Sequence, residues 1–466
     1  YTLTADNSAT GKIIVLGKMT LKDSSTEKKG KIVASQDYTA ASYNGSLIEI
    51  AGEDASMTME SGNISAVRET PDSNGQYGVG VTDGGDFTMT GGKIEAGWFA
   101  VAGNGNYKTQ NSIINITDGE LISTADYAVY LPQSGTTTIS GGKVYGAAGG
   151  VCIQRGTLNV EGTALITSKG TGSTGNWGDG TGGLDCAAIN VSGAYGIATV
   201  NIKGGTLIAE AKSLITEGTT YTPVINVTGG TFSDPSVLKY MATNATVDIK
   251  LLSNINIAKT ELATGYILNA ANATANLNLN GHDIINSSET ADATPFTQIF
   301  TVQNGTLNIS GNGNVKCDAS ATAKDDGYRM VIEARGYGTV NIHGGSYYNT
   351  QKLNTQIDLI YARENGKINI YGGTFESGKY GTPNNDTDGR YWVLNLKNTD
   401  KNTASIQVSG GTFINFNPAN PNMDDNESYL VTGYEVTRDG SVYTAAHKVG
   451  DGRKEYIVGQ TSQENR

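Results

Sequence analysis

The chain has 466 residues, of which 62 are glycine and only 37% are hydrophobic. This length exceeds one ordinary compact domain, so the composition predicts several domains or an array of repeats. The formal net charge is −12, and no Lys/Arg cluster is long enough to follow a phosphate backbone. No apolar run approaches the roughly 20 residues of a membrane-spanning helix. We therefore expect neither a nucleic-acid partner nor a membrane span.

One phrase recurs along the chain, in which alternating apolar residues precede and follow a Gly-Gly or Gly-x pair. The clearest copies are DFTMTGGKIEA from Asp86, TTTISGGKVYG from Thr136, VNIKGGTLIA from Val200, INVTGGTFS from Ile225, VNIHGGSYY from Val340, INIYGGTFE from Ile368 and IQVSGGTFI from Ile406. Alternation with a period of two predicts β-strands. Most pairs lie 20 to 28 residues apart, which is room for one coil of three short strands. The repeats therefore predict a β-solenoid.

The glycine pairs are predicted to form sharp corners between strands. A corner requires either a positive φ angle or space for the coil above, and glycine provides both. The predicted structural corner glycines are Gly91, Gly92, Gly141, Gly142, Gly204, Gly205, Gly229, Gly230, Gly344, Gly345, Gly372, Gly373, Gly410 and Gly411. An asparagine recurs at an equivalent position just before the corner, which predicts a stacked column of amides with a structural role. Its members are Asn159, Asn201, Asn226, Asn308, Asn341 and Asn369.

The order of repeats suggests two consecutive stacks of coils. GKIIVLGKMTLKDSS from Gly11 aligns with ANLNLNGHDIINSS from Ala275, and both resemble the first coil of a stack. We predict one β-helix segment over 1–235, a junction over 236–270 and a second segment over 271–416. A cap with a hairpin around Asp439-Gly440 is predicted over 417–447, and a tail over 448–466. About 18 coils with a rise of ~4.8 Å would form a solenoid on the order of 80 to 90 Å long.

The LNGH phrase from Leu279, the repeated GGTF corners and the hairpin YEVTRDGSVYTA from Tyr434 carry a resemblance. The chain resembles right-handed, single-stranded parallel β-helix proteins (pectin-lyase-like solenoids) of gut Bacteroidales and their phages, including phage head-fibre and other virion appendage proteins. The resemblance covers nearly the whole chain. It implies a non-enzymatic structural or attachment role at a virion surface or, alternatively, a bacterial cell surface. Further copies of the chain, other virion or cell-surface proteins, or host polysaccharides are the implied partners.

The residues give little support to catalysis. Glycoside hydrolysis needs two facing carboxylates, and lyase chemistry needs a base beside Ca²⁺-binding carboxylates. The outward positions of the repeats are mostly Thr, Asn, Lys and Ser, and the acidic pairs Asp325-Asp326 and Asp424-Asp425 lie in predicted loops. The three histidines share no motif, and the three cysteines have no CxxC spacing. We therefore predict no catalytic residue, metal or cofactor, and read Cys152, Cys186 and Cys317 as buried small hydrophobic residues.

The remaining candidates for a binding site are aromatic. Trp177 lies in the glycine-rich insertion KGTGSTGNWGDGTGGLDC from Lys169, and Trp98, Trp392 and Tyr391 also stand beside glycine or loop residues. An aromatic ring can stack on the C–H face of a sugar, but it can equally pack down on the solenoid or on a neighbouring subunit. Two classes of function stay open: an attachment protein that binds glycans or partner subunits, and a carbohydrate-active enzyme.

Overall fold

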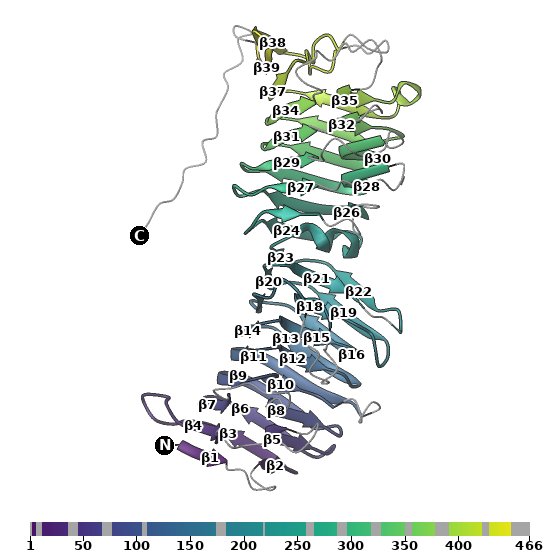
Figure 1. Cartoon of the computed structure of the whole chain (residues 1–466). Coiled ribbons are helices and arrows are strands. Elements are labelled where there is room, and N and C mark those ends of the chain that lie inside the picture. The colour runs from purple at the N-terminus through teal and green to yellow at the C-terminus, as the bar shows by residue number, and fades with distance from the viewer. Residues whose placement is uncertain are drawn as a thin grey trace.

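The protein is an all-β parallel β-helix, as the repeats predicted. Figure 1 shows strands stacked as successive rungs of an elongated solenoid in this computed structural model. The structure describes residues 2–5, 12–35, 45–67, 77–104, 110–173, 183–217, 220–257, 265–286, 296–317, 328–349, 357–377, 391–421 and 428–448. Within these residues, no helix is long and apolar enough to span a membrane.

The lower segment, β1 to β23, stacks three columns of strands. The first column precedes each glycine corner and consists of β3 (Lys18–Leu21), β6 (Ser56–Met59), β9 (Asp86–Ala96), β11 (Ser112–Ser123), β13 (Gly135–Ile139), β16 (Gly156–Val160), β19 (Ala198–Ile202) and β22 (Val224–Val227). The second follows the corner and consists of β1 (Thr2–Ala5), β4 (Lys31–Ala34), β7 (Asn63–Ala66), the ends of β9 and β11, β14 (Lys143–Gly146), β17 (Leu165–Ser168), β20 (Thr206–Ala209) and β23 (Thr231–Phe232). The third consists of β2 (Ile13–Val15), β5 (Ser46–Ala51), β8 (Tyr77–Thr82), β10 (Val101–Ala102), β12 (Tyr127–Leu131), β15 (Gly149–Ile153), β18 (Ala187–Val191) and β21 (Lys212–Thr216).

The upper segment repeats this plan. Its first column comprises β24 (Thr246–Lys250), the ends of β26 (Tyr266–Asn278), β28 (Phe296–Ser310) and β30 (Tyr328–Ile342), then β33 (Lys367–Ile370) and β36 (Ser405–Val408). Its second comprises β25 (Ile255–Asn256), β27 (Ile284–Asn286), β29 (Asn314–Cys317), β31 (Ser346–Asn349), β34 (Thr374–Ser377) and β37 (Thr412–Ile414). Its third comprises the starts of β26, β28 and β30, then β32 (Ile357–Ala362) and β35 (Tyr391–Leu396), after which the short 3₁₀ helix η4 (Asn398–Asp400) follows.

The two segments join with a shift of one column. β24 begins the first column of the upper segment, yet it pairs with β23 of the second column below, with Asp248 opposite Thr231. The 3₁₀ helix η2 (Pro235–Tyr240) precedes this step and buries Val237 and Leu238. Asp234 caps η2 and also accepts a hydrogen bond from the backbone N–H of Ser213 in β21. The upper coils are therefore turned relative to the lower ones while the sheet stays continuous.

The glycine corners behave as predicted, and the two members of each pair have different roles. The second glycine has a positive φ angle in every predicted pair, from 73° at Gly142 to 112° at Gly230. The first glycine instead faces the coil below. A Cβ at Gly229 would lie 2.8 Å from the carbonyl oxygen of Lys203, and one at Gly141 would lie 2.1 Å from that of Thr117. Only glycine meets both requirements.

The predicted asparagine column is confirmed as two amide ladders. In the lower segment the Asn226 amide donates to Asn201 and the Asn201 amide donates to Asn159, each over 3.0 Å. In the upper segment four successive bonds of 2.8 to 3.0 Å run down the column. These bonds join Asn369, Asn341, Asn308, Asn276 and Asp248. The ladders are separate because the column shift places Asp248 above Thr231 instead of Asn226.

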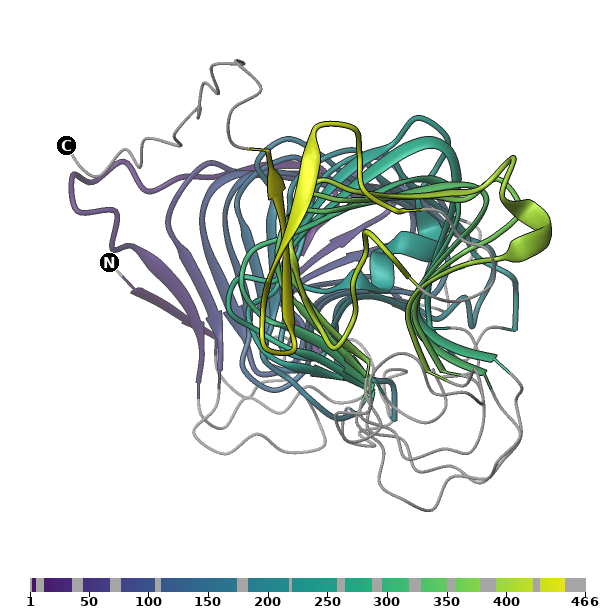
Figure 2. The same ribbon diagram turned by 90° about the horizontal axis from the view of Figure 1, so that it is seen from above.

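One hydrophobic core runs through both segments, from Val15 to Ala445. In the upper second column it contains a stack of rings, with centroids 5.0 Å apart between Tyr347 and Phe375 and again between Phe375 and Phe413. The predicted hairpin is also present. β38 (Tyr434–Asp439) and β39 (Val442–His447) turn at Gly440, and β39 pairs antiparallel with β37. Figure 2 shows the hairpin lying across the end of the stack.

Two expectations were wrong. Residues from Ala275 do not open a new stack, because β26 pairs with β24 below and with β28 above. The coils are also fewer than 18: eight strands form the third column of the lower segment and six parallel strands form the second column of the upper one. The described part therefore has about 14 coils and a length of about 67 Å. Loops between the columns lengthen several coils beyond the 20 to 28 residues that separate most glycine pairs, so a coil number based on that spacing is too high.

Replacing Gly229 and Gly230 by valine tests the corner. We expect the double variant to lower the free energy of unfolding by about 3 kcal/mol or more, because one β-branched side chain clashes with the Lys203 carbonyl and the other is strained at positive φ. Thermal and urea unfolding followed by far-UV circular dichroism measures this. Gly17→Val is the control, since a Cβ there meets no atom within 4 Å. Equal stability of both variants would contradict the corner assignment.

Replacing Asn341 by alanine tests the ladder. Asn341 both donates to Asn308 and accepts from Asn369, whereas Asn226, at the top of the lower ladder, only donates, to Asn201. We expect Asn341→Ala to cost about 2 kcal/mol and Asn226→Ala about 1 kcal/mol or less, because the first leaves two partly buried amides unpaired. Urea unfolding compares the two. A smaller loss at Asn341 than at Asn226 would show that the ladder does not stabilise the stack.

Candidate functional site

The structure does not support sugar stacking by the two described tryptophans. Trp98 is 5% exposed and Trp392 is 6% exposed, so neither presents a ring face to a ligand. The prediction that they bind glycan is corrected accordingly. Tyr391 begins β35, but its side chain lies outside the described residues, as does the whole of Trp177. Those two predictions therefore stay predictions.

Trp98 belongs to a second hydrophobic cluster on the outer side of the third column. The cluster contains Tyr77, Trp98, Phe99, Ala102, Tyr127, Tyr130 and Cys152. Phe99 and Tyr130 stack with centroids 4.7 Å apart, and the Tyr127 hydroxyl donates to the carbonyl oxygen of Asp185 over 2.5 Å. Burial raises the pKa of Tyr127 well above its ordinary value. The sequence carries a signal for this cluster, because YGVGVT, YAVYL and GGVCI are apolar at consecutive positions, as in strands buried on both faces.

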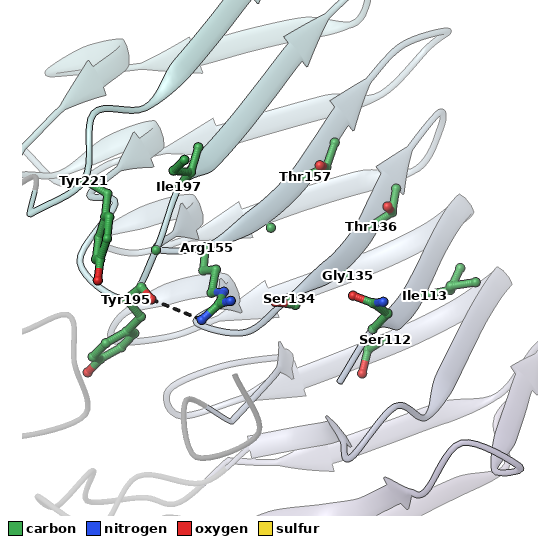
Figure 3. A pocket seen from close by; sticks show the side chains of 13 residues that line it. Ser112, Ile113, Ser134, Gly135, Thr136, Arg155, Thr157, Tyr195, Ile197 and Tyr221 are labelled. Atoms are coloured by element: carbon green, nitrogen blue, oxygen red, sulfur yellow. Dashed lines mark hydrogen bonds between the residues drawn. The ribbon is translucent and has the colours of Figure 1, made fainter. Parts of the chain in front are cut away.

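An open groove lies along the corner between the third and first columns of the lower segment. It has a volume of about 780 Å³. We call it the tyrosine groove, and Figure 3 shows its lining. The lining residues are Asn111, Ser112, Ile113, Ser134, Gly135, Thr136, Arg155, Gly156, Thr157, Tyr195, Gly196, Ile197 and Tyr221. They stand at or near the starts of β11, β13, β16, β19 and β22, which are five successive coils, so the groove follows the solenoid axis for about 19 Å.

Glycines make the floor of the groove. Gly135 and Gly156 have φ angles of 128° and 86°, and a Cβ at either would lie within 3 Å of a carbonyl oxygen of the coil below. Two consecutive coils therefore present bare backbone where other coils would carry side chains. Ile197 and Tyr221, which are 60% and 47% exposed, lie at the other end of this floor. The result is a hollow with apolar and aromatic walls.

Tyr195 and Arg155 are held in place by the second hydrophobic cluster and by each other. The Tyr195 hydroxyl is a hydrogen-bond partner of Tyr130, whose own hydroxyl donates to the Gln154 side chain over 3.0 Å. An Arg155 Nη1–H donates to the carbonyl oxygen of Tyr195 over 3.4 Å. Arg155 is half-buried, and its guanidinium lies among the lining residues of the groove (Figure 3). The groove therefore offers one cation, two tyrosines and the hydroxyls of Ser134, Thr136 and Thr157.

The described lining of the groove contains neither a carboxylate nor an imidazole. Among the thirteen described residues that line it there is no Asp, Glu or His. Hydrolysis would need a facing pair of carboxylates, and proton abstraction would need a base. These side chains can hold an extended polar chain that has an apolar face.

A buried polar cluster lies in the third column of the upper segment. Glu333 and Asp358 are each 2% exposed. Glu333 accepts from the Arg363 guanidinium over 2.6 Å and from Gln298 over 3.2 Å, and Asp358 accepts from Asn395 over 2.8 Å. Both carboxylates therefore have partners. These hydrogen bonds offset part of the cost of burying the two carboxylates.

Two neighbouring groups of this cluster have shifted pKa values. Burial and the negative charge of Asp358 raise the pKa of Tyr361 to about 12. The backbone N–H of Glu364 donates to Asp400 over 2.6 Å and lowers the pKa of that carboxyl. A lowered carboxyl pKa contributes stability at neutral pH that is lost as the pH falls through the folded-state value. The hydrogen bond of Asp400 therefore contributes to stability above the lowered pKa of this carboxyl, and that contribution is lost in acid.

The histidines and cysteines form no site within the described part of the chain. His343 stacks on Tyr371 with centroids 4.7 Å apart, His447 packs edge-on against Tyr434, and His282 lies in the turn after β26. Cys152, Cys186 and Cys317 are buried and free of disulfides. No three His, Cys, Asp or Glu side chains of the described residues come together as metal ligands.

No protein-family model, curated protein or solved structure matches this chain. The class that the structure itself defines is the parallel β-helix with a groove along one corner of its coils. The sequence did not reveal this groove, because Arg155, Tyr195 and Tyr221 lie in connections outside the repeated phrase. Their position in the sequence could have located the groove, since each of them lies one to three residues before the start of a first-column strand.

Removing Arg363 tests the structural role of the buried cluster. We expect Arg363→Met to lower the free energy of unfolding by about 2 to 3 kcal/mol, because it leaves the Glu333 carboxylate buried without its cation. Adding Glu333→Gln should recover part of this loss, since the uncompensated charge is then gone. Urea unfolding of the wild type, both single variants and the double variant measures the coupling. Additive losses in the two single variants would show that the pair is not coupled.

Proposed function

We propose that this chain is a rigid, non-enzymatic attachment protein that binds an extended glycan in the tyrosine groove. The observation that carries the proposal is the groove itself, which crosses five coils and combines exposed Tyr221 and Ile197 with hydroxyl groups and Arg155. An aromatic ring packs on the C–H face of a sugar, and hydroxyl and guanidinium groups bond to its oxygens. The lining has no carboxylate or imidazole, which favours binding without cleavage.

The solenoid supports this role mechanically. The strands of successive coils pair through the backbone, so paired strands hold the short connections that line the groove at both ends. A preorganised surface loses little conformational entropy when it binds. Several copies on one particle would add avidity. This combination suits a virion fibre or decoration protein with its partners on the same particle, located outside the cell. A bacterial surface adhesin would have the same requirements.

The second candidate, a polysaccharide lyase or hydrolase, rests on a different observation. Glu333 and Asp358 are buried carboxylates on one column, and both influence Tyr361. Their complete pairing with Arg363, Gln298 and Asn395 argues against a catalytic role, because a general acid or base must be able to exchange a proton with substrate. The two proposals therefore assign activity to different segments of the molecule, which makes them separable.

A glycan panel tests the proposed function. Purified protein is incubated with pectin, alginate, bacterial capsule and mucin glycans, with and without Ca²⁺, and both binding and release of reducing ends are followed. We expect binding to at least one polymer without release of reducing ends. Tyr221→Ala should weaken that binding about tenfold, because the stacking surface is lost.

Tyr371→Ala is the matched control, since Tyr371 is 50% exposed but lies in the upper segment outside the groove. Its binding should equal that of the wild type. Release of reducing ends that disappears in Glu333→Gln or Asp358→Asn would overturn the non-enzymatic proposal in favour of the enzyme. Equal loss of binding in Tyr221→Ala and Tyr371→Ala would contradict the placement of the glycan in the groove.

A further inference from the structure

We infer that the glycan taken by the tyrosine groove is acidic and that Arg155 binds its carboxylate or sulfate group. The inference rests on the proposed function and specifies its ligand class. It starts from the charge distribution of the groove. Arg155 is the only charged side chain among the thirteen described lining residues, although the whole chain carries a formal charge of −12.

The guanidinium of Arg155 makes few contacts with the described residues. Within the described residues it has no carboxylate partner, and its side-chain hydrogen bond to the Tyr195 carbonyl oxygen is long, at 3.4 Å. By contrast, Arg363 of the upper segment pairs with Glu333 and Glu364. A guanidinium has five N–H donors in a planar fork, which match the two oxygens of a carboxylate or sulfate. Among the described residues, most donors of Arg155 have no partner and can bond to a ligand.

The local backbone holds Arg155 in this position. Gly196 lies against its aliphatic part, and a Cβ at Gly196 would come within 2.8 Å of Cδ and 2.9 Å of Cγ. The absence of a side chain at Gly196 is what lets Arg155 lie across the next coil. Half-burial also strengthens an ion pair, because it is screened less than a pair in open water. Tyr195 and Tyr221 lie on the next two coils above Arg155, where they would pack against the sugar rings on that side of the bound anion.

Matched forms of one polymer test the inference. Chondroitin supplies carboxylates, carboxyl-reduced chondroitin is neutral, and carboxyl-reduced chondroitin sulfate supplies sulfate alone. We expect at least one acidic form to bind about tenfold more tightly than the neutral form at low salt, and the preference to shrink as salt is added. Which acidic form is preferred distinguishes a carboxylate from a sulfate site. Equal affinity for acidic and neutral forms would overturn the inference.

Variants locate the anion site. Arg155→Gln should weaken binding of the acidic form much more than binding of the neutral form, so that the preference for the acidic form is lost. Arg155→Lys should retain part of the preference, since the charge stays but the planar fork is lost. Gly196→Ala should reduce the preference by displacing Arg155. Equal loss of acidic and neutral binding in Arg155→Gln, with an unchanged circular dichroism spectrum, would show that Arg155 only shapes the groove and overturn its role as the anion ligand.

Failure of the inference is distinct from failure of the proposed function. If acidic and neutral polymers bind equally and Tyr221→Ala weakens both, the groove binds glycans but Arg155 does not select them. If no polymer of the glycan panel or of this series binds, the proposed function itself fails.

Discussion

The whole structure depends on the requirement that each corner of a coil lies directly above the corner of the coil below. Parallel strands exchange backbone hydrogen bonds only in this register, and the coil spacing leaves no room for a Cβ at the inner side of the turn. The glycine pairs satisfy the requirement with one residue at positive φ and one beside a carbonyl oxygen, as Gly230 and Gly229 show. The hydrophobic core, the amide ladders and the stack of rings depend on the same register, because it places equivalent side chains of successive coils one above another.

The same register explains where a binding surface can form. Within a stack the strands present alternating side chains that must fit their neighbours, so departures from the repeat gather at the connections. In the lower segment the connections before β13 and β16 contribute Ser134 and Arg155, while those before β19 and β22 contribute Tyr195 and Tyr221. In the upper segment the corresponding connections contain the Arg363–Glu333 ion pair and η4.

The fold could be predicted from the sequence, because a solenoid repeats its signal in every coil. Gly205, Gly230 and Gly373 each follow the same alternating phrase, and the asparagines before them predicted the ladders. The column shift was not predictable, since it depends on how η2 packs under β26, and no local pattern records that. The groove was missed for a related reason: Arg155 and Gly196 are 41 residues apart, and only the stacking of coils brings them together. The prediction that Trp98 and Trp392 bind glycan was wrong because an aromatic residue beside glycine can face inward as well as outward.

The central claim is that glycan binds across the lower coils without involving the buried carboxylates of the upper ones. Amide hydrogen exchange of the wild type with and without saturating acidic glycan tests it most directly, because the connections that line the groove are exposed and exchange sooner than paired strands. The account predicts slower exchange in 132–135, 154–156, 192–197 and 220–223, with unchanged exchange in 333–338 and 361–366. Protection confined to the second group would contradict it and place the ligand at Glu333 and Asp358.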